Sequence, residues 1–79
     1  MTYNEIKKNT YKQIKNKTGL ERVNKAEDYL SENYELKYMS PATEWMDNII
    51  LGFSKKEATK IVVDNMIYCL SSKFNFFIL

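Results

Sequence analysis

The sequence predicts an all-α fold, a compact bundle of three to four short helices forming a single small domain over residues 1–79. Three observations favour this fold. Apolar residues recur at three- and four-residue steps over most of the chain, which is helical spacing. Sequence patterns that start helices occur at Ser40-Pro41 and at Ser54-x-x-Glu57. The chain holds only two Gly and one Pro, and its six Tyr, four Phe and one Trp are too many for a disordered chain.

The first helix is expected to run from about Tyr3 to Thr18, with Thr2 or Asn4 as its N-terminal cap. Gly19 is expected in a left-handed conformation after its end. The inward face follows helical spacing and comprises Tyr3, Ile6, Thr10 and Ile14. The opposite face carries Lys8, Lys12 and Lys15, and it is either a solvated surface or a patch that contacts phosphates.

The second helix is expected from about Leu20 to Tyr34, and we extend it to about Tyr38. Its apolar stripe consists of Leu20, Val23, Ala26, Leu30 and Tyr34. Residues 34–38 also alternate between apolar and polar side chains, as a strand would. A short strand pair formed by residues 34–38 and 74–79 is therefore the alternative.

The third helix begins at Pro41 with Ser40 as its cap, and it ends at Gly52. Its apolar face is expected to include Trp45, Met46, Ile49 and Ile50. The fourth helix begins after Ser54, whose side chain forms a capping box with Glu57. Its core face is expected to comprise Ala58, Ile61, Val62, Met66, Cys69 and Leu70, and Val63, Ile67 and Tyr68 widen that face. Such a helix is either central to the bundle or partly exposed for a partner.

The chain ends on an apolar run that includes Phe74, Phe76, Phe77 and Leu79. Chain ends usually fray into water, so this composition needs an explanation. Either the tail folds back to complete a small core, or it docks in a complex or a homodimer.

Residues 51–62 predict two helices joined by a tight turn at Gly52-Phe53, and this local pattern resembles two unrelated families. Leu51, Gly52, Phe53, Ala58, Ile61 and Val62 are similar to the turn of ubiquitin-associated-like three-helix modules, a resemblance that implies a protein-binding surface at the turn. The same segment resembles a DNA-binding helix-turn-helix, which implies that Lys55, Lys56, Thr59 and Lys60 face DNA. Asp47 and Asn48 depart from that second pattern, because apolar and small residues usually pack the two helices there. A plain helical hairpin, with Phe53 anchored in the core, is the third interpretation.

Composition excludes much chemistry. With no His, the chain has no imidazole base and no Cys–His zinc site, and two isolated glycines form no phosphate-binding loop. Cys69 lies in an apolar stretch, which raises the pKa of a thiol and makes it inert. A core of this size leaves little room for a substrate pocket. We therefore expect no enzyme activity, no cofactor, no metal site and no small-molecule substrate.

Charge is unevenly distributed although the net charge is only +2. The balance is +5 over residues 1–25, −5 over residues 26–51 and +2 over residues 52–79. Arg22 is the only Arg, so phosphate contacts are more plausible than base recognition. The sequence shows neither a signal peptide nor a membrane-spanning stretch, and the single Cys fits a reducing compartment, so a cytoplasmic location is expected.

The functional prediction is a non-catalytic interaction module that docks on a larger protein, as an accessory subunit, adaptor or inhibitor, for example of DNA-processing machinery. Its protein-binding residues are predicted to be Phe53, Ile67, Phe74, Phe76 and Phe77. The alternative is a nucleic-acid-binding protein that contacts phosphates through Lys8, Lys12, Lys15, Lys55, Lys56 and Lys60.

Overall fold

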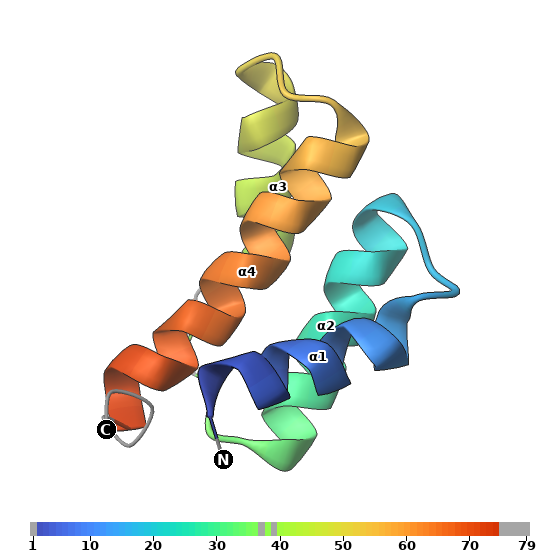
Figure 1. Cartoon of the computed structure of the whole chain (residues 1–79). Coiled ribbons are helices and arrows are strands. Elements are labelled where there is room, and N and C mark those ends of the chain that lie inside the picture. The colour runs from blue at the N-terminus through green and yellow to red at the C-terminus, as the bar shows by residue number, and fades with distance from the viewer. Residues whose placement is uncertain (1, 37, 39, 75–79) are drawn as a thin grey trace.

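The fold consists of four α-helices joined by short turns (Figure 1). Their bounds are α1 (Tyr3–Ile14), α2 (Gly19–Asn33), α3 (Pro41–Ile50) and α4 (Lys55–Phe74). The computed structural model describes residues 2–36, 38 and 40–74, with side chains described as far as residue 70. The described residues contain no strand, so the predicted all-α bundle is confirmed.

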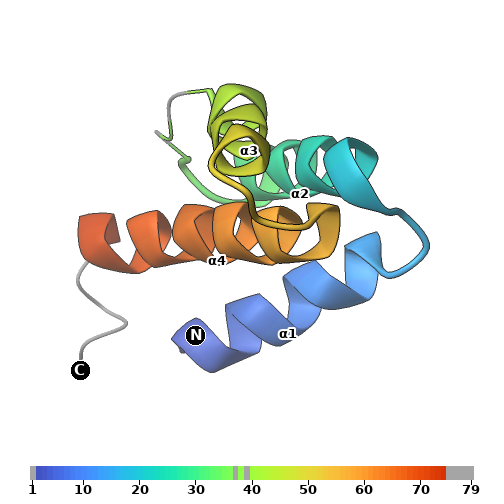
Figure 2. The ribbon, with the colours of Figure 1, turned by 90° about the horizontal axis from the view of Figure 1, so that it is seen from above.

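α4 lies at the centre of the bundle, and the other three helices pack against it. α2 also contacts both α1 and α3, whereas α1 and α3 do not touch each other. Figure 2 shows α4 between α1 on one side and α3 on the other. Of the two predicted roles for the fourth helix, the central one is therefore confirmed.

The core follows the predicted helical stripes closely. Its fully or nearly buried apolar side chains are Ile6, Ile14, Val23, Ala26, Leu30, Trp45, Ala58, Val62, Val63, Met66, Ile67 and Leu70. α4 supplies half of them. Val63 and Ile67, which widen the apolar face of α4, are buried because α4 has neighbours on several sides. Thr10 is also buried, and its hydroxyl donates to the Ile6 carbonyl at 2.7 Å.

Two helix starts are fixed by capping boxes. The predicted one at α4 is confirmed, because Ser54 Oγ accepts from the Glu57 N–H at 3.1 Å and Glu57 Oε1 accepts from the Ser54 N–H at 3.0 Å. At α1, Thr2 is the cap and makes the equivalent reciprocal bonds with Glu5. Each box satisfies two N–H groups that the helix itself leaves free.

Several predicted boundaries differ from the structure. α1 ends at Ile14 rather than Thr18, and Gly19 takes the expected left-handed conformation (φ 56°) but begins α2. α2 ends at Asn33, so its predicted extension to Tyr38 is wrong, and the described residues between 34 and 38 form no strand either. Of the strand partner proposed at residues 74–79, Phe74 is the last residue of α4, and residues 75–79 lie outside the described part of the chain. The inward stripe of α1 ends at Ile14, and the expected cap at Gly19 placed the predicted end of the helix four residues too late.

The start of α3 differs in mechanism from the prediction. Ser40 does precede Pro41, but its side chain makes no capping hydrogen bond. Its backbone has a left-handed conformation (φ 52°), which is uncommon for a residue other than Gly. Pro41 at the first helical position, with its φ already set for a helix, thus starts α3 without the predicted cap.

One buried hydrogen bond joins α3 to α4. The Trp45 indole Nε1 donates to Thr59 Oγ1 at 3.0 Å, and Thr59 Oγ1 donates to the Lys55 carbonyl at 2.6 Å. Trp45 is 7% exposed and Thr59 is 3% exposed, so water cannot replace this acceptor easily. The expectation that Thr59 faces a nucleic acid is therefore wrong.

We predict that Thr59→Val lowers the free energy of unfolding by about 1–3 kcal/mol, because it leaves the buried indole N–H without an acceptor. The matched control is Thr43→Val, at an exposed position of α3, which should change stability by no more than about 0.5 kcal/mol. Urea unfolding of the three proteins measures both effects. Equal stabilities for the two variants would contradict the role of the Trp45–Thr59 bond.

Candidate functional site

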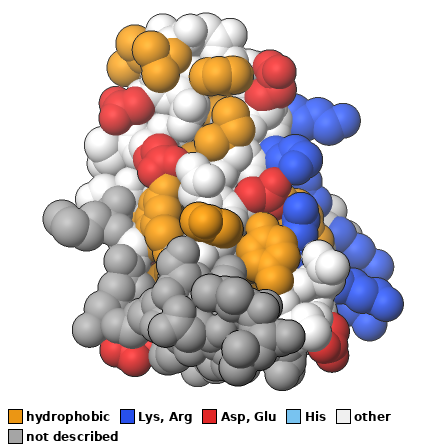
Figure 3. Space-filling model, turned by 60° about the vertical axis from the view of Figure 1, so that its left-hand side comes forward, with side chains coloured by type: hydrophobic (Ala, Val, Ile, Leu, Met, Phe, Trp, Pro, Cys, Tyr) orange, Lys and Arg blue, Asp and Glu red, His pale blue; other side chains and the backbone are white. Residues whose placement is uncertain are grey.

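The turn between α3 and α4 carries an exposed apolar surface. We call Met46, Ile50, Leu51 and Phe53 the apolar tip; their side chains are 51%, 79%, 76% and 41% exposed, respectively. In Figure 1 this turn forms the upper end of the molecule, and Figure 3 shows apolar side chains at that end. Large apolar residues exposed together indicate an interaction site more often than single exposed ones do.

Local structure explains why the tip faces solvent. The inward side of α3 holds Pro41 and Trp45, so Met46 and Ile50, one helical turn apart, lie on another side. α3 then ends in a tight turn in which the Gly52 N–H donates to the Ile49 carbonyl at 3.0 Å. The φ of Gly52 is +105°, a conformation that disfavours any residue with a side chain.

The structure corrects two expectations for this segment. Phe53 is no core anchor, because it is substantially exposed, and Leu51 supports no packing between α3 and α4. The two family resemblances therefore differ in how well they agree with the exposed residues of this turn. The helix-turn-helix pattern needs Leu51 and Phe53 inside, whereas the ubiquitin-associated-like pattern implies a binding surface at this turn.

The other predicted protein-binding residues do not join the tip. Ile67 lies inside the core and is 1% exposed. The prediction that it contacts a protein partner is therefore wrong, because that side of α4 faces the neighbouring helices. Phe74 is the last residue of α4, and its side chain lies outside the described part. Phe76 and Phe77 lie wholly outside the described residues.

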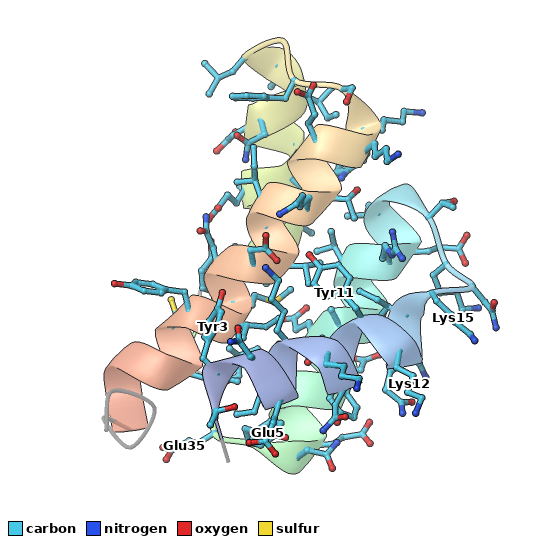
Figure 4. The ribbon with its side chains drawn as sticks, viewed as in Figure 1. Tyr3, Glu5, Tyr11, Lys12, Lys15 and Glu35 are labelled. Carbon is cyan, nitrogen blue, oxygen red and sulfur yellow. The ribbon has the colours of Figure 1, made fainter. Side chains whose placement is uncertain are left out.

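All six predicted nucleic-acid contacts are exposed, but they form two groups. Figure 4 shows Lys12 on α1 and Lys15, directly after its last residue, projecting away from α4. Lys8 is also exposed on α1, whereas the second group comprises Lys55, Lys56 and Lys60 on α4. Figure 3 shows Lys and Arg side chains along one side of the molecule.

A carboxylate on α4 ties α1 to α4. Asp64 accepts a hydrogen bond from the Tyr11 hydroxyl at 2.6 Å and one from Lys60 Nζ at 2.7 Å, and Lys7 Nζ lies 3.8 Å away. Figure 4 shows Tyr3 and Tyr11 on the side of α1 that faces α4. Burial, together with the bond to Asp64 and its negative charge, raises the pKa of Tyr11. Lys60 is therefore partly neutralised, and its pKa is raised by this pairing.

A cleft lies where the first turns of α2 and α4 meet. Its volume is about 370 Å³, and it is lined by Thr18, Gly19, Arg22, Lys55, Lys56 and Thr59. We call it the basic cleft, because its lining holds three cations and no carboxylate. Thr18 and Arg22 were not predicted as site residues. The sequence offered one signal for Arg22, because it is the only Arg of the chain.

Glu44 makes hydrogen bonds within the fold, and its charge acts on the Cys69 thiol. Glu44 accepts hydrogen bonds from the Tyr38 hydroxyl and, at 2.9 Å, from Asn65 Nδ2. Burial raises the pKa of the Cys69 thiol, and the negative charge of Glu44 adds to this effect, as the apolar surroundings led us to expect. The described residues contain no group of three or more His, Cys, Asp or Glu that would hold a metal ion.

Comparisons of the chain with protein family models, curated proteins and solved structures found no match. Within the described residues, no helix combines the length and apolar character needed to cross a membrane. The apolar tip and the basic cleft are therefore the two surfaces from which a function is inferred.

We predict that Tyr11→Phe lowers the free energy of unfolding at pH 7 by about 1–2 kcal/mol, because it removes the bond to Asp64. The folded-state pKa of Tyr11 is raised, so this contribution is fully present below the unfolded-state pKa of about 10. It is lost as pH rises from there through the folded-state value. The stabilities of wild type and Tyr11→Phe should therefore converge above about pH 10.

Urea unfolding at neutral and alkaline pH measures this convergence. Thr43→Val, at an exposed position of α3 and without a titrating side chain, is the control, and its difference in stability from wild type should be the same at both pH values. A gap between wild type and Tyr11→Phe that widens with pH would contradict the assignment.

Proposed function

We propose that this protein is a non-catalytic interaction module that docks on a larger protein through the apolar tip. The observation that carries the proposal is the exposure of four large apolar side chains on one helical turn and the loop after it. The accompanying roles, accessory subunit, adaptor or inhibitor, all use such a surface.

The energetics favour a larger partner over a second copy. Weighted by exposed fraction, the four side chains would contribute roughly 4–7 kcal/mol on full burial. Association itself costs about 4–15 kcal/mol, so the tip needs additional contacts around it. Two such tips meeting end to end would bury little area beyond themselves, whereas a groove on a larger protein surrounds the tip and adds those contacts.

We predict that the double variant Ile50→Ser/Leu51→Ser folds like wild type, because both side chains already face water. Its affinity for the partner should fall by at least about 2 kcal/mol, roughly thirtyfold, as expected for the centre of an interface. The matched control is Tyr68→Ser, which removes a 64% exposed ring elsewhere on α4 and should bind normally.

The measurement has two stages. Tagged wild type, tip variant and control capture proteins from the native host with nuclease treatment in parallel, and a protein retained by wild type and control alone is identified. That protein is then purified and titrated with each variant by calorimetry. Equal affinities of tip variant and wild type for every captured protein would overturn the proposal.

A second candidate function, nucleic-acid binding, is favoured by the gathering of Lys and Arg side chains along one side of the molecule (Figure 3). The contacts would be to phosphates, through Lys8 and Lys12 on α1, Lys15 directly after it, and Lys55, Lys56 and Lys60 on α4. Asp64 offsets part of the charge of Lys60, so the other five would contribute more.

We predict for this candidate that Lys8→Glu/Lys12→Glu/Lys15→Glu folds normally, since all three side chains are exposed. The variant should lose affinity for double-stranded DNA, and the salt slope of binding should become shallower by about 0.9 per lost phosphate contact. Fluorescence anisotropy at several salt concentrations measures both quantities. The absence of DNA binding by wild type at low salt would remove this candidate.

A further inference from the structure

The basic cleft concentrates positive charge that the fold leaves uncompensated. Within the described part of the chain, Lys55 and Lys56 make no ion pair or side-chain hydrogen bond. No carboxylate belongs to the lining of this cleft. Glu57 accepts from the Ser54 N–H, and Asp64 pairs with Lys60. Glu21, in the first turn of α2, makes no ion pair within the described residues. Mutual repulsion of three cations around one hollow is relieved when an anion enters.

Arg22 is held in place at the edge of this cleft. Its Nε donates to the Ile14 carbonyl at 3.3 Å, and its guanidinium carbon lies 5.9 Å from the centre of the Tyr11 ring. These contacts use one nitrogen and one face of the guanidinium. The two terminal nitrogens have no other protein partner among the described residues, and a guanidinium fork fits the paired oxygens of a phosphate.

The remaining lining adds neutral donors. Thr18 precedes α2, and its hydroxyl makes no capping bond, so it stays available to a ligand. Gly19 leaves the backbone accessible at the same place. Thr59 contributes only its methyl side, because its hydroxyl is already bonded to Trp45 and Lys55.

From these features we propose that the basic cleft binds a phosphate group, contacted by Arg22, Lys55, Lys56 and Thr18. Three positive charges match a phosphate dianion better than the single charge of a carboxylate. The volume of about 370 Å³ falls within the usual range of about 300–1,000 Å³ for small-ligand sites, so a mononucleotide fits as well as a phosphate alone. A phosphodiester strand would present the same chemistry. The lining of this site includes no residue of the apolar tip, so the inference does not rest on the docking function; it shares Lys55 and Lys56 with the nucleic-acid candidate.

The test is a titration of ¹⁵N-labelled protein at low salt with inorganic phosphate, adenosine monophosphate and a decathymidylate strand. We expect saturable shifts of the backbone amides of Gly19, Arg22, Lys55 and Lys56, and none with acetate at equal ionic strength. Similar affinity for phosphate and the mononucleotide assigns a simple phosphate site. Tighter binding of the mononucleotide assigns a nucleotide site, and tightest binding of the strand assigns a phosphodiester site.

The decisive variant is Lys55→Glu/Lys56→Glu, since neither lysine supports the fold. It should weaken binding of all three probes by at least about tenfold. Its control, Lys25→Glu/Gln13→Glu/Ser31→Glu, makes the same change of net charge at exposed positions outside the cleft lining and should leave phosphate affinity within about twofold. The tip variant Ile50→Ser/Leu51→Ser should bind phosphate normally, which separates this inference from the docking proposal.

Two outcomes would overturn the inference. One is the absence of saturable shifts at the cleft with any of the three probes. The other is equal weakening by the cleft variant and its control, because binding would then depend on net charge rather than on this site.

Discussion

α4 buries side chains around about half of its circumference, at about 100° per residue, and a single neighbouring helix cannot cover so wide a face. α1, α2 and α3 each cover a different part of it. A chain of this length buries only about 60% of the surface that it exposes when unfolded, so few apolar groups can serve both the core and a binding surface. α3 packs one side against α4, and Met46 and Ile50 on its other side remain exposed to solvent. The apolar tip is thus a by-product of covering α4 with a short helix.

The fold was largely predictable because its signals are local. Helical stripes identified the buried residues of α1, α2 and α4, and the box at Ser54 and Glu57 fixed where α4 begins. Boundaries were harder. The segment after Asn33 keeps an apolar pattern, yet it crosses from α2 to α3, and Tyr38 binds Glu44 there. Periodicity does not distinguish a residue that packs within a helix from one that packs in a connection.

The candidate sites depended on tertiary contacts and were less predictable. Phe53 was identified as a candidate binding residue, but the same pattern also allowed it to be a core anchor. The structure buries Trp45 and leaves Phe53 largely exposed. Ile67 was placed on the wrong side because a wide apolar helix face looks the same whether helices or a partner cover it. The basic cleft joins residues 18–22 to residues 55–59, and no sequence spacing indicates that juxtaposition.

The separation of α1 from α3 has a consequence for how this protein opens. Both helices pack against α2 and α4, and they make no contact with each other. α1 is fastened across by the Tyr11–Asp64 bond, and α3 by the Trp45–Thr59 bond. If α1 detaches, the contacts of α3 with α2 and α4 therefore remain in place, and the same holds for α1 if α3 detaches. We therefore expect amide hydrogen exchange to show two independent low-energy openings, one of α1 and one of α3, above a shared α2–α4 unit. The apolar tip changes with the opening of α3, whereas the lining of the basic cleft lies at the starts of α2 and α4.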